Sequence, residues 1–473
     1  MDVTDAAIPL LTLAQLASAE RDLELPFAIV AVTERGEERL VVTEILRLLP
    51  GRRLAARARL QSTPGADAAK EVMLKLFYGD GATGYCQREH KGYKLLQQAN
   101  LQTPECLGQG DNALLYRWLP DAQTVSEFSS DQLDLTVERI GMLHRAGLIQ
   151  TDMHLENFLF HEGKVWLLDP DGVRSAGAAD PAEPAYRDNL AILFAQLSPN
   201  QDLAIAPRLM RYCHGADLAM DSQAAARLSA QLPNAVEQAR ARRVNRYLDK
   251  TLRDCTEFHA ARGPGRRFVC RRESLGPMLK QFAQDPEAVL HTATVIKAGN
   301  TATVMRVMLD GESRIVKRYN IKGAMHRLRQ SLRSKSRAER SWRNGHRLRF
   351  LRIPTPEPIA LLETRHFGLR DVAYLITEDL GQLDLLGELK EQPLSQRRIN
   401  QIVELFESLR LAKLCHGDTK ATNLLVHNDA LYLIDLDSMR TSVGGFDRDR
   451  ERFANNWPAE SELGRQIRSR LGL

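Results

Sequence analysis

The sequence lacks the features that mark exported, membrane-spanning and zinc-scaffold proteins. Its six cysteines include no Cys-x-x-Cys pair and are too sparse for a disulfide framework or a zinc ribbon. No apolar run approaches the roughly 20 residues that a membrane-spanning helix needs. No basic region precedes the apolar stretch of residues 1–16, as one would in a signal peptide. We therefore expect a protein of a reducing, cytoplasmic compartment.

Net charge is also small, at +5 for 473 residues, but it is unevenly distributed. Residues 1–260 hold 28 Lys and Arg against 35 Asp and Glu, which leaves 37 against 25 for residues 261–473. Much of the excess lies between Lys322 and Arg352, where eleven basic residues accompany one acid, Glu339. This asymmetry predicts that the C-terminal half meets an anionic partner.

One long internal repeat organises the chain. Residues 143–174 align without a gap on residues 409–440, at a constant offset of 266. The identical pairs include Asp152 with Asp418, Asn157 with Asn423, Asp169 with Asp435, and Asp171 with Asp437. Solenoid repeats are far shorter than this, so the offset indicates a duplicated domain.

Matched features also lie upstream of each copy. Residues 72–75 and 314–317 read as strands that end in lysine, at Lys75 and Lys317. A helical segment and a Thr-Pro pair follow each strand, the pairs beginning at Thr103 and Thr355. Pro and Gly interrupt the pattern at residues 260–266, which predicts a linker there. We therefore expect one domain over residues 1–260 and a second over residues 261–473.

The repeated residues suit phosphoryl transfer, which needs a carboxylate for the acceptor proton, oxygen ligands for Mg²⁺ and a cation for the nucleotide phosphates. In this interpretation Asp152 and Asp418 face the acceptor hydroxyl, and Lys75 and Lys317 hold the phosphates. The expected magnesium ligands are Asn157 and Asp169 in the first copy, and Asn423 and Asp435 in the second.

This set resembles the protein-kinase-like fold, with Asp-x4-Asn as its catalytic loop. The sequences of residues 416–423, 433–437 and 374–380 resemble the corresponding motifs of the lipopolysaccharide core kinase family. The resemblance implies an α+β protein of two tandem kinase-like domains, each with a small β-rich N-lobe and a helical C-lobe. It also implies ATP and Mg²⁺, and as acceptor a heptose or Kdo sugar of the lipopolysaccharide inner core.

Further site residues follow from the same resemblance. Glu378 and Leu380 fall in the hinge that would contact the nucleotide, and Lys420 falls beside the transferring phosphate. Glu89 and Glu339 are the helical acids that would fix the two strand lysines. Glu89 lies 14 residues before Thr103, whereas Glu339 lies 16 before Thr355, and Ser341 stands at the equivalent offset.

The sequence departs from the kinase pattern at several positions. Neither half has a Gly-x-Gly-x-x-Gly loop, since Gly51 and Gly299 each stand alone. In the first copy Gln150 replaces His416, and His154 replaces Lys420. Only 36 residues follow Asp437, which predicts a short C-lobe for the second domain.

Two alternatives remain open at this point. His-Gly-Asp loops also resemble aminoglycoside and choline phosphotransferases, whose cationic substrates need acidic pockets. One or both halves could instead be a pseudokinase that scaffolds lipopolysaccharide assembly. The basic run from Lys322 to Arg352 favours an anionic acceptor and a peripheral contact with the anionic inner-membrane surface. No nucleic-acid motif accompanies it, so we expect no nucleic-acid partner.

Overall fold

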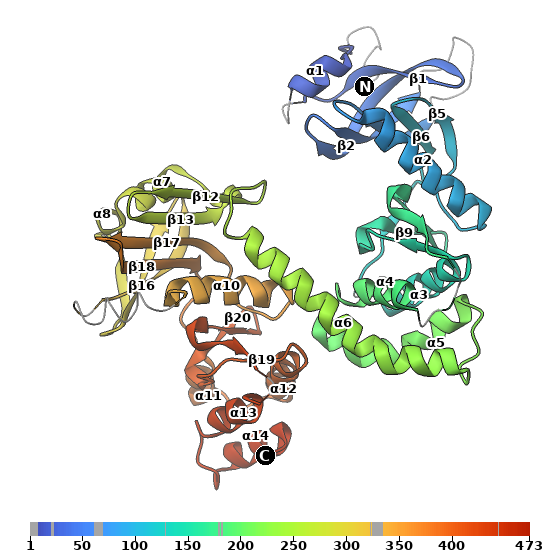
Figure 1. Cartoon of the computed structure of the whole chain (residues 1–473). Coiled ribbons are helices and arrows are strands. Elements are labelled where there is room, and N and C mark those ends of the chain that lie inside the picture. Colours follow the sequence, from blue (N-terminus) through green and yellow to red (C-terminus); the bar gives the residue numbers. More distant parts are fainter. Residues whose placement is uncertain are drawn as a thin grey trace. The chain divides into compact units, whose positions relative to one another are not determined.

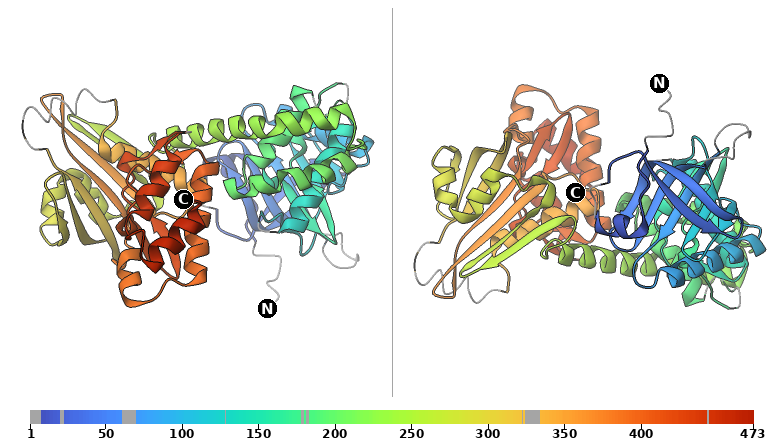
Figure 2. Two further views of the ribbon diagram at one scale, coloured as in Figure 1. Left: turned by 90° about the horizontal axis from the view of Figure 1, so that it is seen from below. Right: turned by 90° about the horizontal axis from the view of Figure 1, so that it is seen from above.

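The computed structural model describes residues 8–19, 23–60, 70–127, 129–177, 180, 183–321, 323, 334–442 and 444–473. The chain forms two compact units. Unit 1 comprises Met1–Gln196 and Leu203–Ala239, and unit 2 comprises Leu197–Asp202 and Arg240–Leu473. The division falls within the long helix α6 (Gln223–Lys250). Figure 2 shows each unit from two further sides.

Unit 1 begins with a six-stranded sheet in the order β1-β2-β3-β4-β6-β5, in which every neighbouring pair is antiparallel. Its apolar side chains pack into one core with Leu16 of helix α1 (Leu13–Ser18). Helix α2 (Ala82–Gln98) follows β4 in the chain. The strands are β1 (Phe27–Thr33), β2 (Gly36–Leu49), β3 (Arg53–Leu60), β4 (Glu71–Phe77), β5 (Cys106–Gln109) and β6 (Ala113–Arg117).

The rest of unit 1 is mainly helical, with short strands around the predicted catalytic loop. The helices are α3 (Ser130–Arg145), α4 (Pro184–Phe194) and α5 (Ile205–Gly215). The strands are β7 (Gln123–Thr124), β8 (Leu148–Gln150), β9 (Phe158–His161), β10 (Lys164–Leu167) and β11 (Val173–Ser175). The expected β-hairpin after the loop is present as β9 and β10, paired from Phe158–Leu167 to His161–Lys164.

Unit 2 begins with a seven-stranded antiparallel sheet in the order β12-β13-β17-β18-β16-β15-β14. The strands are β12 (Phe258–Gly263), β13 (Arg266–Arg271), β14 (Thr294–Ala298), β15 (Ala302–Leu309), β16 (Glu312–Tyr319), β17 (Pro358–His366) and β18 (Leu369–Glu378). The helices α7 (Pro277–Gln284) and α8 (Pro286–Leu290) contribute Leu279, Phe282 and Leu290 to the sheet's core. Residues 260–266, expected to be a linker, instead belong to the β12–β13 hairpin.

Helix α10 (Arg337–Phe350) lies between this sheet and the helical part of unit 2 (Figure 1). The helical part contains α11 (Leu385–Glu391), α12 (Gln396–Leu411), α13 (Phe446–Ala454) and α14 (Glu462–Leu471). Its short strands are β19 (Leu414–Cys415), β20 (Leu424–His427), β21 (Ala430–Leu433) and β22 (Arg440–Thr441). As expected from the spacing of Ile399, Ile402 and Phe406, a helix with an apolar buried face leads into the motif.

The two sheets share a five-strand order, β2-β3-β4-β6-β5 in unit 1 and β14-β15-β16-β18-β17 in unit 2. The additional strands lie at opposite edges, because β1 pairs with β2 whereas the β12–β13 hairpin pairs with β17. The fold is therefore α+β, as predicted. Within the described ranges, no helix is long and apolar enough to cross a membrane.

Candidate active site

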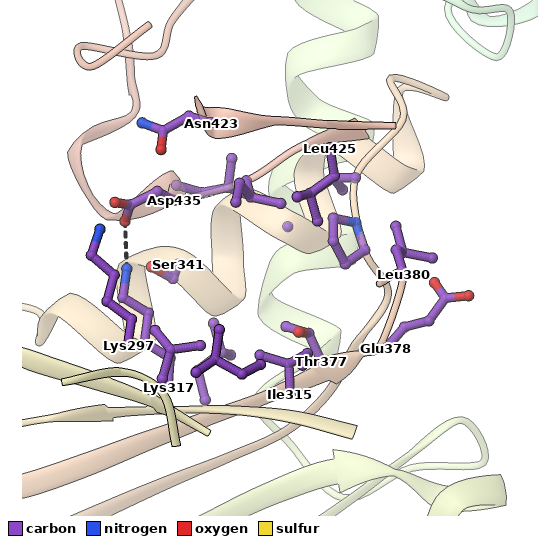
Figure 3. A pocket seen from close by; sticks show the side chains of 18 of the residues that line it. Lys297, Ile315, Lys317, Ser341, Thr377, Glu378, Leu380, Asn423, Leu425 and Asp435 are labelled. Atoms are coloured by element: carbon purple, nitrogen blue, oxygen red, sulfur yellow. Dashed lines mark hydrogen bonds and ion pairs between the residues drawn. The ribbon is translucent and has the colours of Figure 1, made fainter. Parts of the chain in front are cut away.

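A cavity of about 440 Å³ lies in unit 2 beside β14, β15, β16 and β18, and the motif residues lie at its edge (Figure 3). Its walls are mostly apolar, and its polar groups gather at the end that holds Lys317 and Asp435. This is the usual build of a small-ligand pocket, in which apolar walls bury a flat group and a few polar groups set its orientation. The apolar lining includes Ile296, Val304, Ile315, Leu375, Leu425 and Ile434.

The lysine of strand β16 and the aspartate after β21 meet in this cavity, as the sequence predicts for the two halves of a phosphate and metal site. Lys317 Nζ donates to Asp435 Oδ1. Asp435 adopts a left-handed backbone conformation, with φ of 62°, which is uncommon for a residue with a side chain. Burial acts to raise the pKa of Asp435, but the Lys317 ammonium outweighs burial and lowers it below the ordinary value of 3.8. The carboxylate is therefore ionised at neutral pH.

The predicted catalytic loop runs from β19 to β20 at the same edge. Asn423 lines the cavity and donates through Nδ2 to the backbone oxygen of Asp418 at 2.8 Å. The Asp418 carboxylate is 31% exposed, and it lies 3.1 Å from Lys420 Nζ and 3.7 Å from an Arg452 nitrogen. Asp418 is thus an accessible acid between two basic groups, a setting that suits an anionic acceptor.

Two buried side chains hold this loop in shape. His416 Nε2 donates to the oxygen of Ile434 at 2.8 Å, and His416 Nδ1 accepts from the Asp418 backbone nitrogen at 3.3 Å. Asp449 of α13 accepts from the backbone nitrogens of His416 and Gly417. These bonds tie the loop both to the Asp435 strand and to the helical part of unit 2.

Unit 1 offers a natural replacement for this histidine, because Gln150 makes a similar pair of bonds. Its Nε2 donates to the backbone oxygen of Asp169 at 2.9 Å, and its Oε1 accepts from the backbone nitrogen of Asp152 at 3.3 Å. We expect His416→Gln to change the free energy of unfolding by less than about 1 kcal/mol. His416→Ala leaves two partly buried backbone groups, the Ile434 oxygen and the Asp418 nitrogen, without their histidine partner and should cost about 1–3 kcal/mol. Urea unfolding followed by tryptophan fluorescence measures both, and equal losses would contradict the bridging role.

The hinge residues lie where the sequence predicts. Glu378 and Leu380 line the cavity, and Thr377 lies beside them. Asp379 faces away from this group, since it pairs with Arg306 at 2.6 Å and accepts from Ser313 Oγ at 2.6 Å. These two bonds fix the end of β18 to its own sheet and hold the hinge at the cavity wall.

The predicted partner of Lys317 is wrong. Glu339 is not brought to the lysine, because its carboxylate pairs with Arg267 at 3.1 Å. Ser341, two positions further along α10, lines the cavity and bonds to Tyr319 Oη at 2.9 Å. Two residues along a helix rotate the side-chain direction by about 200°, so Glu339 and Ser341 face opposite sides. The position equivalent to Glu89 is therefore the one with the same offset from the Thr-Pro pair, Ser341, and not the nearest acidic residue.

In unit 1 the expected lysine and glutamate do meet. Lys75 Nζ donates to Glu89 and, at 3.0 Å, to Asp169 Oδ1. Asn157 Nδ2 donates to the Asp152 oxygen at 2.7 Å, which repeats the loop geometry of unit 2. Asp169 also has a positive φ, of 50°. The structure therefore brings Lys75, Glu89 and Asp169 together.

Two further side chains distinguish the unit 1 site. Arg53 Nη1 lies 3.3 Å from Asp169 and 3.7 Å from Glu89. Burial acts to raise the pKa of Asp169, but Lys75 and Arg53 outweigh it and lower the pKa to about 2. Tyr116 is only 1% exposed, and Lys75 Nζ lies 5.8 Å from its ring centroid.

Strand register shows what stands at these places in unit 2. Lys75 pairs with Ala55 and Leu114, whereas Lys317 pairs with Val304 and Leu375. Counting two residues along each strand from these pairs, Arg53 and Tyr116 correspond to Ala302 and Thr377. The aspartate carboxylates differ accordingly, with Asp169 16% exposed and Asp435 37% exposed.

Sequence reasoning missed Lys297 and Arg337. Lys297 of β14 lines the cavity, and Figure 3 shows it directed toward Asp435 beside Lys317. Arg337 of α10 pairs with Asp437 at 2.5 Å, and Arg88 of α2 pairs with Asp171 at 2.8 Å. Asp171 and Asp437 thus tie a helix to the loop that carries Asp169 in unit 1 and Asp435 in unit 2. The only available signal for Lys297 was its place in a predicted loop with Gly299.

The described part of the basic run is largely used inside unit 2. Lys322 and residues 324–333 lie outside the described residues. Within α10, Arg337 pairs with Asp437 and Arg343 pairs with Asp249. The same helix buries Trp342, His346 and Leu348. Residues 337–350 therefore form a packed helix and not a free basic face.

The donor chemistry fits a hard cation that shares its ligands with a nucleotide. Asp435 supplies a carboxylate and Asn423 an amide oxygen, which are the ligand types that Mg²⁺ takes. Among the described residues, no three His, Cys, Asp or Glu side chains gather as a metal cluster. Mg²⁺ usually keeps waters and substrate phosphates as ligands, so these two donors suit it.

A comparison with family models matches the part of the chain that holds this cavity. Residues 287–456 match the model of the family described as Lipopolysaccharide kinase (Kdo/WaaP). A comparison with curated proteins finds no significant match. One solved structure similar to the chain is described as WaaP in complex with acyl carrier protein. It has 20% sequence identity and a TM-score of 0.33, over 43% of this chain and 86% of that chain.

Proposed function

We propose that unit 2 phosphorylates a heptose or Kdo hydroxyl of the lipopolysaccharide inner core with ATP, because residues 287–456 match the model of the lipopolysaccharide kinase (Kdo/WaaP) family. The observation that carries this proposal is the cavity of about 440 Å³ with Lys317 and Asp435 at one end. Its apolar walls suit an adenine ring, and its charged end suits phosphates. Asp418 lies in the loop that also supplies Asn423 to the cavity.

Each polar residue then has a role in the transfer. Lys317, with Lys297, would hold the nucleotide phosphates, and Asp435 with Asn423 would hold Mg²⁺. Bound Mg²⁺ supplies charge stabilisation on the phosphate oxygens. The Asp418 carboxylate takes the proton of the acceptor hydroxyl as its oxygen bonds to the γ-phosphorus and the bond to ADP breaks. Lys420 offsets the charge that develops beside it.

The surroundings of Asp418 favour an anionic acceptor over a cationic one. Lys420 and Arg452 flank the carboxylate within 4 Å, whereas an aminoglycoside or choline would need acidic neighbours. The inner core carries carboxylates and phosphates, which basic groups bind. This supports the lipopolysaccharide acceptor and not the small-molecule kinase alternative.

We also infer that unit 1 is a second kinase-like domain that does not turn over ATP. Arg53 lies against Asp169, where Mg²⁺ would bind, and Tyr116 fills the position of the cavity-lining Thr377. An arginine at the metal carboxylate competes with the metal for the same charge. Unit 1 would then act as a scaffold, which is the pseudokinase alternative applied to one half.

Phosphate transfer from γ-labelled ATP tests the proposed function. The acceptors are purified core lipopolysaccharide, free Kdo, free heptose, kanamycin and choline. We expect labelling of the core, with label released in heptose or Kdo phosphate after mild hydrolysis. Labelling of kanamycin or choline without labelling of the core would overturn the proposal, as would absence of transfer to every acceptor by folded protein.

A further inference from the structure

A second, polar cavity of about 390 Å³ lies in unit 2 away from the nucleotide cleft. It lies at the edge of the sheet where the β12–β13 hairpin pairs with β17. In unit 1 the corresponding strand, β5, is the last strand of its sheet and has no such hairpin beside it. Five arginines line it, and three of them come from the hairpin. They are Arg262, Arg266, Arg267, Arg365 and Arg370.

The acids in this cavity neutralise only part of the positive charge. The two lining carboxylates are Glu339 and Glu363, and both pair with Arg267, at 3.1 Å and 3.3 Å. One guanidinium thus accounts for both acids. The lining thus contains five arginines against two glutamates.

Neutral backbone groups position other arginines without offsetting their charge. Arg266 donates to the Ala283 oxygen at 3.3 Å, and Arg365 donates to the Gly368 oxygen at 3.2 Å. Neither they nor Arg262 has a carboxylate partner among the residues that the structure describes. A positioned guanidinium with uncompensated charge is the group that binds phosphate in a forked, two-point contact.

The geometry points to a phosphate-binding pocket formed by Arg262, Arg266 and Arg365, for a phosphate ester carried by a sugar or by a lipid headgroup. The site is a concave cavity and not an extended basic stripe, so it suits one compact anion and not a nucleic-acid backbone. Arg267 with its two glutamates forms the ionic floor that holds the hairpin against β17 and α10. This inference does not depend on the transfer reaction proposed for the cleft.

Binding measurements on the full chain test the pocket. The Lys317→Ala background removes the cleft's own phosphate ligand, so that binding there does not obscure the result. Arg262→Ser/Arg365→Ser removes two pocket guanidiniums and leaves the Arg267 floor intact. Arg448→Ser/Arg465→Ser removes two exposed arginines of α13 and α14 and is the charge-matched control. The probes are glucose 6-phosphate with glucose as blank, and phosphatidylcholine vesicles with and without 30% phosphatidylglycerol.

We expect the pocket variant to weaken glucose 6-phosphate binding about tenfold or more, while the control variant binds as the parent does. If only vesicle binding falls, and only in the pocket variant, the phosphate source is the lipid headgroup and the pocket stands. Equal effects of the two variants on both probes would overturn the proposal, because surface charge alone would then explain them. A single-stranded RNA is the third probe, and a larger loss of RNA binding than of binding to either other probe would also overturn the proposal.

Discussion

Replacement of Asp418 by asparagine should lower phosphate transfer to core lipopolysaccharide by about 10²- to 10⁴-fold, the usual contribution of a positioned general base. Asp152→Asn should leave transfer within about twofold of the parent. The reason is that Asp418 belongs to the unit with a cavity lined by Lys317, Asn423 and Asp435. The Asp152 loop instead adjoins an aspartate already paired with Lys75 and Arg53. Initial rates with saturating ATP measure both.

Nucleotide affinity serves as the control for these two variants. Asp418 lies outside the residues that line the cavity, so Asp418→Asn should bind ATP with unchanged affinity and lose only turnover. The shape and charge of the loop are nearly preserved, since asparagine is isosteric with aspartate. Loss of transfer in Asp152→Asn with retention in Asp418→Asn would reverse the assignment of the working unit.

Exchanging the residues that distinguish the two sites should weaken nucleotide binding in unit 2 and create it in unit 1. Ala302→Arg places in unit 2 the arginine that unit 1 has at the same strand position, and we expect it to weaken binding of Mg²⁺ and an ATP analogue at least about tenfold. The introduced guanidinium would pair with Asp435 and compete with the metal for its charge. Isothermal titration of the full chain measures the affinity.

The opposite exchange should open unit 1. Arg53→Ala/Tyr116→Thr gives unit 1 the residues found at Ala302 and Thr377, and we expect the stoichiometry to rise from about one to about two nucleotides per chain. Ala302→Ser, which adds no charge, is the matched control for the closing variant and should bind as the parent does. Two nucleotides bound by the parent chain would show that Arg53 and Tyr116 do not close the site.

Much of the candidate site was predictable because its residues are close in sequence and occur twice. The Asp-x4-Asn loop, the hairpin after it and the aspartate that follows form one local segment, residues 418–435 in the second copy. Lys317 was predictable for a different reason, since a strand that carries a lysine two residues before its end precedes each loop. The family resemblance is confirmed for residues 287–456, which contain this whole set.

The errors arose where the decisive contact joins distant parts of the chain. Glu339 was chosen as the only acid in a basic helix, but Arg267 of the β12–β13 hairpin lies 72 residues away in sequence and takes its carboxylate. The same hairpin was expected to be a linker, because Gly263, Pro264 and Gly265 interrupt the apolar pattern. These residue types occur in linkers and in β-turns alike, so the sequence did not distinguish the two. The arginines of α10 were expected to face an anionic partner, but two of them pair within unit 2, with Asp249 and Asp437.

The sequence alone indicated which chemistry to expect, since the duplicated Asp, Asn and Asp in register with a strand lysine are the residue types that phosphoryl transfer uses. Only the tertiary structure showed how the two copies differ around the paired lysine and aspartate. Strand register places Arg53 and Tyr116 in one site and Ala302 and Thr377 in the other, and neither position belongs to a motif. A cavity exists only where side chains from several strands leave space between them, and that depends on long-range packing that no local pattern records.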